Sequence, residues 1–256
     1  MGLALNNANY PSIAQGVVAG YPFTLCGWFR VPAVSLFLPL MGMNDTTAGV
    51  RYELYYSGHT TGQIGANAYD GGSAVAISGV AATPETWFHA AGVFASETDR
   101  RVYLDGGNLG TNATSRSWSG TNLLYAGNRN NSTAVDVAEA AVFAAALSGA
   151  DAAALANGVS PLALARSHSL VVYQDLITRL NRPGLGPTLS AAAGASYVGH
   201  PRMLYGGPPQ SAGRIRVPRP WRLGGLQFAA SGVTAGQTFV AGAAGDSQRT
   251  FGEVIS

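Results

Sequence analysis

The sequence predicts an all-β fold, an antiparallel β-sandwich with one short helix. Short segments that are apolar or alternate between apolar and polar residues run through the first half of the chain, separated by Gly, Asn, Asp, Pro or Ser. Strands at a spacing of roughly 8–12 residues indicate a sandwich or barrel, because a sheet with one apolar face must cover it with another sheet. The third observation is a single alanine-rich stretch that carries signals for the start and the end of a helix.

The first strands are predicted from these segments in order. Each segment is rich in aromatic or β-branched residues and ends at a turn signal. They are FTLCGWFRV (23–31), VSLFLPLM (34–41), VRYELYYS (50–57), QIGANAY (63–69) and AVAISGV (74–80).

The stretch WFHAAGVFASETDRRVYLDG (87–106) predicts two further strands and two turns. Alternate residues from Phe88 to Phe94 are apolar and lie on one side of an extended strand. The polar residues 96–100 turn the chain, and Asp105-Gly106-Gly107 turns it again because Gly adopts the positive φ that a tight hairpin needs. More strands are predicted in NLGTNA (108–113) and TNLLYAGN (121–128).

The helix is predicted over Gly149–Ala156. Ser148 is a suitable N-cap and Asp151 follows three residues later, which resembles a capping box. Asp151 also suits the positive end of the helix dipole, and Asn157-Gly158 ends the helix.

The overall composition indicates a packed core with a sparsely charged surface. Hydrophobic residues make up 47% of the chain and charged residues only 11%, against roughly 25% in average proteins. The one cysteine, Cys26, cannot form an internal disulfide and is predicted to be a small buried residue. The first residues, MGLALNNANYPS, lack the basic start and the apolar run that are typical of a signal peptide. No stretch approaches the roughly 18 apolar residues of a membrane span.

The charge distribution predicts a domain boundary near residue 160. Residues 1–160 hold 6 Arg against 10 acidic residues, whereas residues 161–256 hold 9 Arg against 3 acidic residues. We therefore expect a sandwich domain over 1–160 and an extended, partly β C-terminal region over 161–256. Within that region SLVVYQDL is a strand or a helical turn, and 188–205 is a further strand.

The C-terminal region contains an Arg/Pro-rich arm over 206–225. Proline disfavours helix there and favours an extended conformation. Three roles are open for such an arm. It is a solvated linker, or it docks on a protein partner and supports attachment or oligomerisation, or it contacts nucleic acid. Nucleic acid is the least favoured of the three. Its candidate partner-binding residues are Arg214, Arg216, Arg219, Trp221 and Arg222.

Three segments resemble the laminin-G-like branch of the concanavalin A-like lectin/glucanase jelly roll. They are FTLCGWFRVP (23–32), TWFHAAGVFASETDRRVYLDGGNLG (86–110) and VDVAEAAVFAAALSGADAAALANG (135–158). The resemblance implies a jelly roll with a final strand followed by a short helix. Trp28 and Trp87 are then expected between the two sheets, with their indole N–H groups bonded to carbonyl oxygens.

The C-terminal region is similar to extensions that follow such domains in tailed-phage and prophage proteins. The segments that carry this likeness are LVVYQDL (170–176) and HPRMLY (200–205). The resemblance implies a non-enzymatic virion structural protein, a capsid decoration or a tail or fibre module that is assembled in the host cytoplasm. Its expected partners are other virion proteins and further copies of the chain.

A carbohydrate-binding module is the alternative function. Exposed aromatic rings stack on sugar faces, and the candidate rings are those of Tyr55, Tyr56, Tyr69 and Trp118. The two functions are compatible, because a displayed lectin-like domain can bind a host glycan.

Catalysis is not expected. Retaining glycoside hydrolysis needs two carboxyl groups about 5–5.5 Å apart, and Asp136 and Glu139 are wrongly spaced for this on a strand. His89 lies within a strand with no nucleophile motif nearby, so a hydrogen-bonded structural role is predicted for it.

The sequence predicts no cofactor. Calcium is the one metal for which candidate ligands were considered. Relatives carry an Asp in the last strand where this chain has Ala138, and Asp136 is on the opposite strand face. Calcium takes six to eight oxygen ligands. The remaining candidate ligands are turn residues: Asn44, Asp45, Asp70, Asn130 and Asn131.

Overall fold

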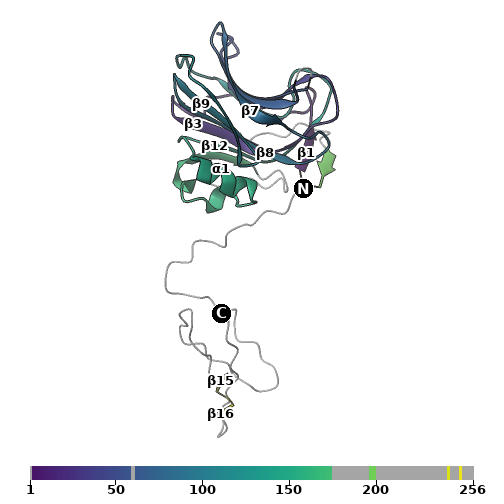
Figure 1. Cartoon of the computed structure of the whole chain (residues 1–256), viewed down its shortest axis with the longest axis vertical. Helices are drawn as coiled ribbons and strands as arrows, with labels where there is room; N and C mark the ends of the chain where they lie inside the picture. The colour runs from purple at the N-terminus through teal and green to yellow at the C-terminus, as the bar shows by residue number, and fades with distance from the viewer. Residues whose placement is uncertain (1, 59–60, 175–195, 200–240, 243–247, 250–256) are drawn as a thin grey trace. The chain divides into compact units, whose positions relative to one another are not determined.

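The structure is a computed structural model that describes residues 2–58, 61–174, 196–199, 241–242 and 248–249. Two antiparallel sheets pack face to face, and one short helix lies against the sheet that contains β3, β9 and β12 (Figure 1). The predicted all-β sandwich with a single short helix is therefore confirmed.

Sheet A runs in the order β10-β9-β8-β3-β12-β1-β14, and β13 also pairs with β12. Sheet B runs in the order β2-β11-β4-β5-β6-β7. The strands of sheet A are β1 (Gly2–Leu5), β3 (Phe23–Arg30), β8 (Phe88–Ser96), β9 (Asp99–Leu104), β10 (Gly107–Asn112), β12 (Val135–Phe143), β13 (Leu170–Gln174) and β14 (Ser196–Val198). Those of sheet B are β2 (Ser12–Ile13), β4 (Phe37–Asn44), β5 (Arg51–Ser57), β6 (Gln63–Tyr69), β7 (Ser73–Ala81) and β11 (Leu123–Ala126).

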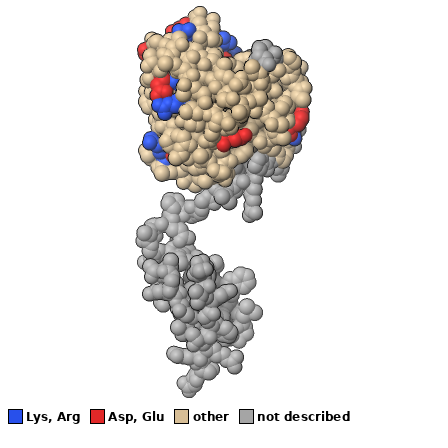
Figure 2. Space-filling view, viewed as in Figure 1, with Lys and Arg blue, Asp and Glu red and all other residues tan. Residues whose placement is uncertain are grey.

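The main core fills the space between the two sheets. The Phe23 ring stacks on Phe94 with centroids 4.7 Å apart, and the Tyr52 ring meets Phe23 edge-on at 5.5 Å. All three side chains are buried, and burial of one such side chain contributes about 1.5–3 kcal/mol. Charged side chains are few and scattered on the side of the sandwich seen in Figure 2, as the low charge content leads one to expect.

The segment between β10 and β11 is tied to this core by a buried cation and by a tryptophan. The Arg100 guanidinium donates to the backbone oxygens of Glu97 and Thr114. The Trp118 ring stacks on Tyr52 at 4.9 Å. These contacts give the Nη groups of a fully buried guanidinium their acceptors, while its Nε has none, and they hold the connecting segment against the sandwich.

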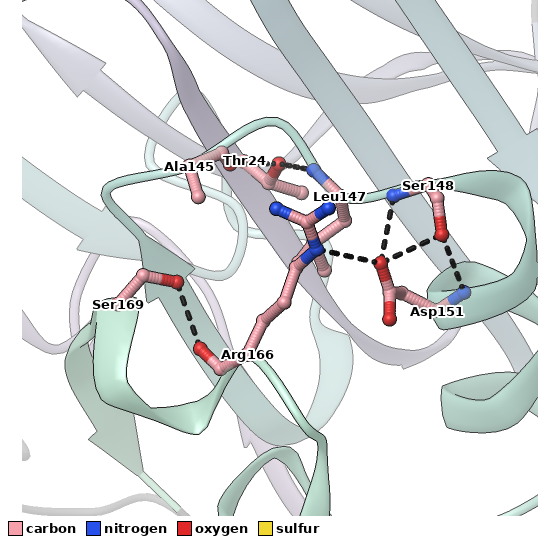
Figure 3. A network of polar contacts seen from close by, with 7 residues as sticks. All are labelled: Thr24, Ala145, Leu147, Ser148, Asp151, Arg166 and Ser169. Carbon is pink, nitrogen blue, oxygen red and sulfur yellow. Dashed lines mark hydrogen bonds and ion pairs between the residues drawn. The ribbon is translucent and has the colours of Figure 1, made fainter.

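Helix α1 (Gly149–Ala156) begins with the predicted capping box. Asp151 N–H donates to Ser148 Oγ at 3.2 Å, and Ser148 N–H donates to an Asp151 carboxylate oxygen at 2.9 Å. Figure 3 shows how Arg166 joins the same carboxylate at 3.3 Å, while Thr24 of β3 binds the chain just before the helix. The Thr24 contacts thus fix the start of α1 to sheet A.

Two edge strands, β7 of sheet B and β10 of sheet A, approach each other closely. A Cβ atom at Gly110 would lie 1.8 Å from the backbone oxygen of Ile77. Only glycine fits at this position, because the clash would be with backbone atoms that cannot rotate away.

The sandwich continues past the boundary predicted at residue 160. The short helices η1 (Pro161–Ala163) and η2 (Ser167–Ser169) lead into β13, and β13 and β14 belong to sheet A. The chain divides into one compact unit over Met1–Gly206 and a second over Gly207–Ser256. Within the second unit the structure describes the short hairpin of β15 (Ala241–Gly242) and β16 (Gln248–Arg249). The predicted arm residues, from Arg214 to Arg222, lie outside the described residues.

Candidate ligand-binding site

The outer faces of the two sheets are covered differently. Ala152 and Leu155 of α1 pack on the outer face of sheet A, against Cys26 and Ala91. In the part of the chain that the structure describes, no helix packs on the outer face of sheet B, and the strands that contact sheet B from the other layer lie on its inner face. The outer face of sheet B is called the open face below.

Strand register brings five side-chain positions into one row across the open face. Tyr125 of β11 pairs with Gly42 of β4, which pairs with Glu53 of β5. Glu53 pairs with Asn67 of β6, and Asn67 pairs with Val75 of β7. A buried carboxylate and a buried amide therefore lie side by side in the middle of the sheet.

Glu53 is held by two hydrogen bonds. Tyr125 Oη donates to one Glu53 carboxylate oxygen at 3.0 Å, and Asn67 Nδ2 donates to the other at 3.4 Å. Burial, with the charge of Glu53 as a further cause, raises the pKa of Tyr125 well above its ordinary value, so the phenol keeps its proton and remains a donor. Gly42 leaves room for the Tyr125 ring, since a Cβ there would lie 2.6 Å from Tyr125 Oη.

The Asn67 amide oxygen is buried and has no hydrogen-bond partner. Such atoms are rare in folded proteins and are often partnered by water or a ligand. Because Asn67 borders Glu53, an unsatisfied acceptor lies next to a carboxylate on the open face.

Aromatic rings flank this polar row. The Tyr55 ring lies over Gly65, where a Cβ would be 2.2 Å from Tyr55 Cζ, and Phe37 packs on Tyr55 with centroids 4.5 Å apart. On the other side, the half-buried Tyr10 meets the Tyr125 ring edge-on at 6.3 Å. The open face therefore presents rings on both sides of a carboxylate–amide pair.

Two arginines complete the face. The Arg51 guanidinium lies over the Tyr69 ring, 4.4 Å from its centroid. Arg129 lies over the Tyr125 ring at 5.1 Å. Its Nη1 faces the Asn44 amide, whose oxygen accepts from it when the amide is turned so that both of its groups have partners. Arg51, Tyr69 and Arg129 are all half-buried, so part of each can contact a ligand.

The structure separates the four aromatic residues that the sequence suggested for sugar binding. Tyr55 and Tyr69 lie on the open face, with Tyr55 only 9% exposed. Tyr56 faces the core and is 4% exposed, so the prediction of an exposed ring is wrong there. Trp118 is half-buried against the core and stacks on Tyr52, which is also not the free ring that was predicted.

Residues that the sequence argument did not select complete the open face. Glu53, Asn67 and Tyr125 each have an outward register position that alternation could have indicated, since Glu53 and Tyr55 are two residues apart on β5. The adjacent Tyr55 and Tyr56 must point to opposite faces, so they could not both have belonged to one site.

A second polar cluster lies on the outer face of sheet A, where Trp28 pairs with His89 and their ring centroids are 5.6 Å apart. Trp28 and Trp87 are on this outer face and not between the sheets as predicted. Trp87 Nε1 donates to the backbone oxygen of Gly199 at 2.6 Å, whereas Trp28 Nε1 and His89 Nδ1 are buried without partners. The prediction of a hydrogen-bonded His89 imidazole is thus wrong for Nδ1.

Two of the candidate calcium ligands are engaged in turns. Asp45 accepts hydrogen bonds from the N–H groups of Thr47 and Ala48, which lower its carboxyl pKa. Asn131 accepts from Asn128 and from the Thr133 N–H. Within the described ranges, no group of three or more His, Cys, Asp or Glu side chains could hold a metal ion. Nor is any described helix long and apolar enough to cross a membrane.

Comparison with family models matches residues 5–153 to the concanavalin A-like lectin/glucanases superfamily, more than half of the chain. The chain belongs to this superfamily. The resemblance predicted from three sequence segments is therefore confirmed at the level of the superfamily. Comparison with curated proteins gives no match.

Solved structures support the superfamily fold. A heptameric SAP-like pentraxin from Limulus polyphemus is 13% identical, with a TM-score of 0.51 over 68% of this chain and 91% of the pentraxin. A proposed carbohydrate-binding protein from Bacteroides ovatus is 14% identical, with a TM-score of 0.50 over 72% of this chain and 53% of that protein. A sialidase from Trypanosoma rangeli is 19% identical, with a TM-score of 0.42 over 53% of this chain and 22% of the enzyme, and a score this low supports no inference. At these identities the likeness establishes the fold alone.

Proposed function

We propose that the chain is a non-catalytic carbohydrate-binding module whose ligand contacts the open face of sheet B. The observation that carries this proposal is the pairing of half-exposed aromatic rings with the Glu53–Asn67 pair on a sheet face that no described helix covers. The superfamily fold is consistent with it, as lectins share this architecture.

The chemistry of the open face suits a sugar. The rings of Tyr10, Phe37 and Tyr69 offer apolar surfaces for the C–H faces of a pyranose, while polar groups between them bind hydroxyls. A hydroxyl that donates to the Asn67 amide oxygen would satisfy the buried acceptor that has no partner, whose burial otherwise costs about 1–3 kcal/mol.

The surroundings of Glu53 favour binding over hydrolysis. Its neighbours across the strands are Gly42 and Asn67, and its neighbours on the same face of β5 are Arg51 and Tyr55. Retaining hydrolysis needs a second carboxyl group about 5–5.5 Å away, and none of these four positions supplies one.

Calorimetry on glycans selected from an array tests the proposal. Tyr69→Ala removes a half-exposed ring, and Asn67→Leu removes the unpartnered amide oxygen with little change of volume. We expect each to weaken binding at least about tenfold, which corresponds to the loss of about 1.4 kcal/mol. Leu109→Ala, at an exposed position on β10, is the matched control and should bind as the wild type does. Failure of the wild type to bind any glycan, or unchanged affinity in both variants, would refute the proposal.

A second candidate role is display of this module on a phage virion. It is supported by the division of the chain into a sandwich unit and a unit over Gly207–Ser256, and by the arginine excess after residue 160. In this role the arm over 206–225 attaches the chain to other virion proteins or to further copies of itself. Mass spectrometry of purified particles tests it: the chain should be present in stoichiometric amount, and its absence from virions would refute this role.

A further inference from the structure

We propose that the ligand of the open face is an anionic saccharide, whose carboxylate or sulfate group is bound by Arg51 and Arg129. This inference rests on the proposed function, and it adds the chemical class of the ligand. These two arginines differ in their partners from the other arginines of the described sandwich.

The other arginines already have oxygen acceptors. Some form ion pairs with carboxylates, and some donate to backbone oxygens. The ion pairs are Arg30–Asp136, Arg101–Asp99 and Arg166–Asp151, and the donors to backbone oxygens are Arg100 and Arg116.

Arg51 and Arg129 form no ion pair within the described residues. Arg51 packs on the Tyr69 ring, and its Nε is buried without a hydrogen-bond partner. Arg129 packs on the Tyr125 ring, and its Nη1 faces the neutral Asn44 amide. A guanidinium with unused donors is an incomplete arrangement, because its five N–H groups match the paired oxygens of a carboxylate or sulfate.

The two arginines lie in one neighbourhood. Asn44 pairs in register with Arg51, and its side-chain amide faces Arg129 Nη1. Both guanidinium charges also act on the Tyr125 hydroxyl: burial and Glu53 raise the pKa of this phenol, and the charges of Arg129 and then Arg51 lower it. Two cations therefore flank one region of the open face.

Glu53 does not neutralise these cations. Both of its carboxylate oxygens accept hydrogen bonds, one from Tyr125 and one from Asn67, and it forms no ion pair with Arg51 or Arg129. Asp45 and Asp70 lie in the turns that follow β4 and β6, whereas Arg51, Arg129 and Glu53 on the face itself together carry one net positive charge. A single anionic group would balance it.

The geometry of the arginines prepares them for such a group. Each guanidinium is stacked on a ring, which restricts its orientation before a ligand arrives. Less conformational entropy is then lost on binding, and charge-assisted hydrogen bonds are stronger than neutral ones. An anionic sugar can place its charged group between Arg51 and Arg129 while its ring packs on Tyr69.

The test compares three polysaccharides by affinity electrophoresis and calorimetry: a neutral galactan, polygalacturonate and a sulfated galactan. We expect the wild type to bind a charged polymer at least about tenfold more tightly than the neutral one, and more weakly as salt is raised. Arg51→Met and Arg129→Met should each lose about tenfold to a hundredfold, as for one charge-assisted hydrogen bond. Preference for polygalacturonate would assign a carboxylate, and preference for the sulfated galactan a sulfate.

Arg101→Met is the matched control, since it removes an arginine of a surface ion pair on the other sheet. It should bind as the wild type does, and circular dichroism confirms that each variant is folded. Binding of the neutral galactan with equal affinity, unaffected by either arginine variant, would overturn the anionic class and leave the carbohydrate-binding function standing. No binding of any of the three polymers, by any of the folded proteins, would count against both.

Discussion

Acid should destabilise the sandwich through His89, because its imidazole is buried beside Trp28. Burial lowers the pKa of His89 from its ordinary 6.5 to about 3. The folded protein therefore keeps this imidazole neutral, while the unfolded chain takes up a proton below pH 6.5. The unfolded state binds more protons in this window, so the free energy of unfolding falls as the pH falls from 6.5 towards 3.

The size of the effect follows from the two pKa values. Each pH unit inside the window contributes about 1.4 kcal/mol, so lowering the pH from 7 to 4.5 should cost about 2–3 kcal/mol through this one group. Below pH 3 the full loss is about 5 kcal/mol, a third or more of the stability of a typical domain.

Denaturant unfolding of the wild type and of His89→Gln between pH 4.5 and pH 7.5 isolates this contribution, because the carboxyl groups are common to both proteins. The difference in unfolding free energy between wild type and variant should shift by about 2–3 kcal/mol in favour of the variant at the acidic end. His168→Gln, which removes an exposed imidazole, is the matched control. Parallel pH profiles for wild type and His89→Gln would refute the reasoning.

Three further predictions concern packing and reactivity. Gly110→Ala would place a Cβ 1.8 Å from the backbone oxygen of Ile77 and should lower the unfolding free energy by about 1–3 kcal/mol or more, whereas Gly107→Ala, with nothing within 4 Å, should change it far less. Trp118→Ala should cost about 2–4 kcal/mol in thermal unfolding because its ring stacks in the core, and a stability change below about 0.5 kcal/mol would contradict that role. Burial raises the pKa of the Cys26 thiol to about 12, so a thiol reagent at pH 8 should modify it only after unfolding, and rapid labelling of the native protein would contradict this.

Local sequence pattern was sufficient for most strands and for the helix. The capping box of Ser148 and Asp151 acts within one turn, so it can be recognised without knowing the rest of the fold. The strand predicted over 34–41 instead runs over Phe37–Asn44, because the Val34 N–H donates to the Pro32 oxygen and the chain is still in a turn there. The short strand Gly2–Leu5 was missed, since its extended form depends on pairing with β12 far along the chain.

The candidate site was harder to predict because it depends on pairing between distant strands. Alternation along β5 was enough to separate Tyr55 from Tyr56, and a stricter use of it would have selected Glu53 with Tyr55. The contact between Tyr125 and Glu53 spans 72 residues of sequence and requires the register of three strands. No local feature of the sequence contains that register.

The close approach of β7 and β10 also affects how copies of this protein behave near one another. An outermost strand exposes a row of unpaired N–H and C=O groups to which a strand of another molecule can add, and this is a common route to aggregation. Here the outermost strands of two different sheets obstruct each other, with Gly110 allowing the near contact. This side of the sandwich is therefore protected from intermolecular strand addition.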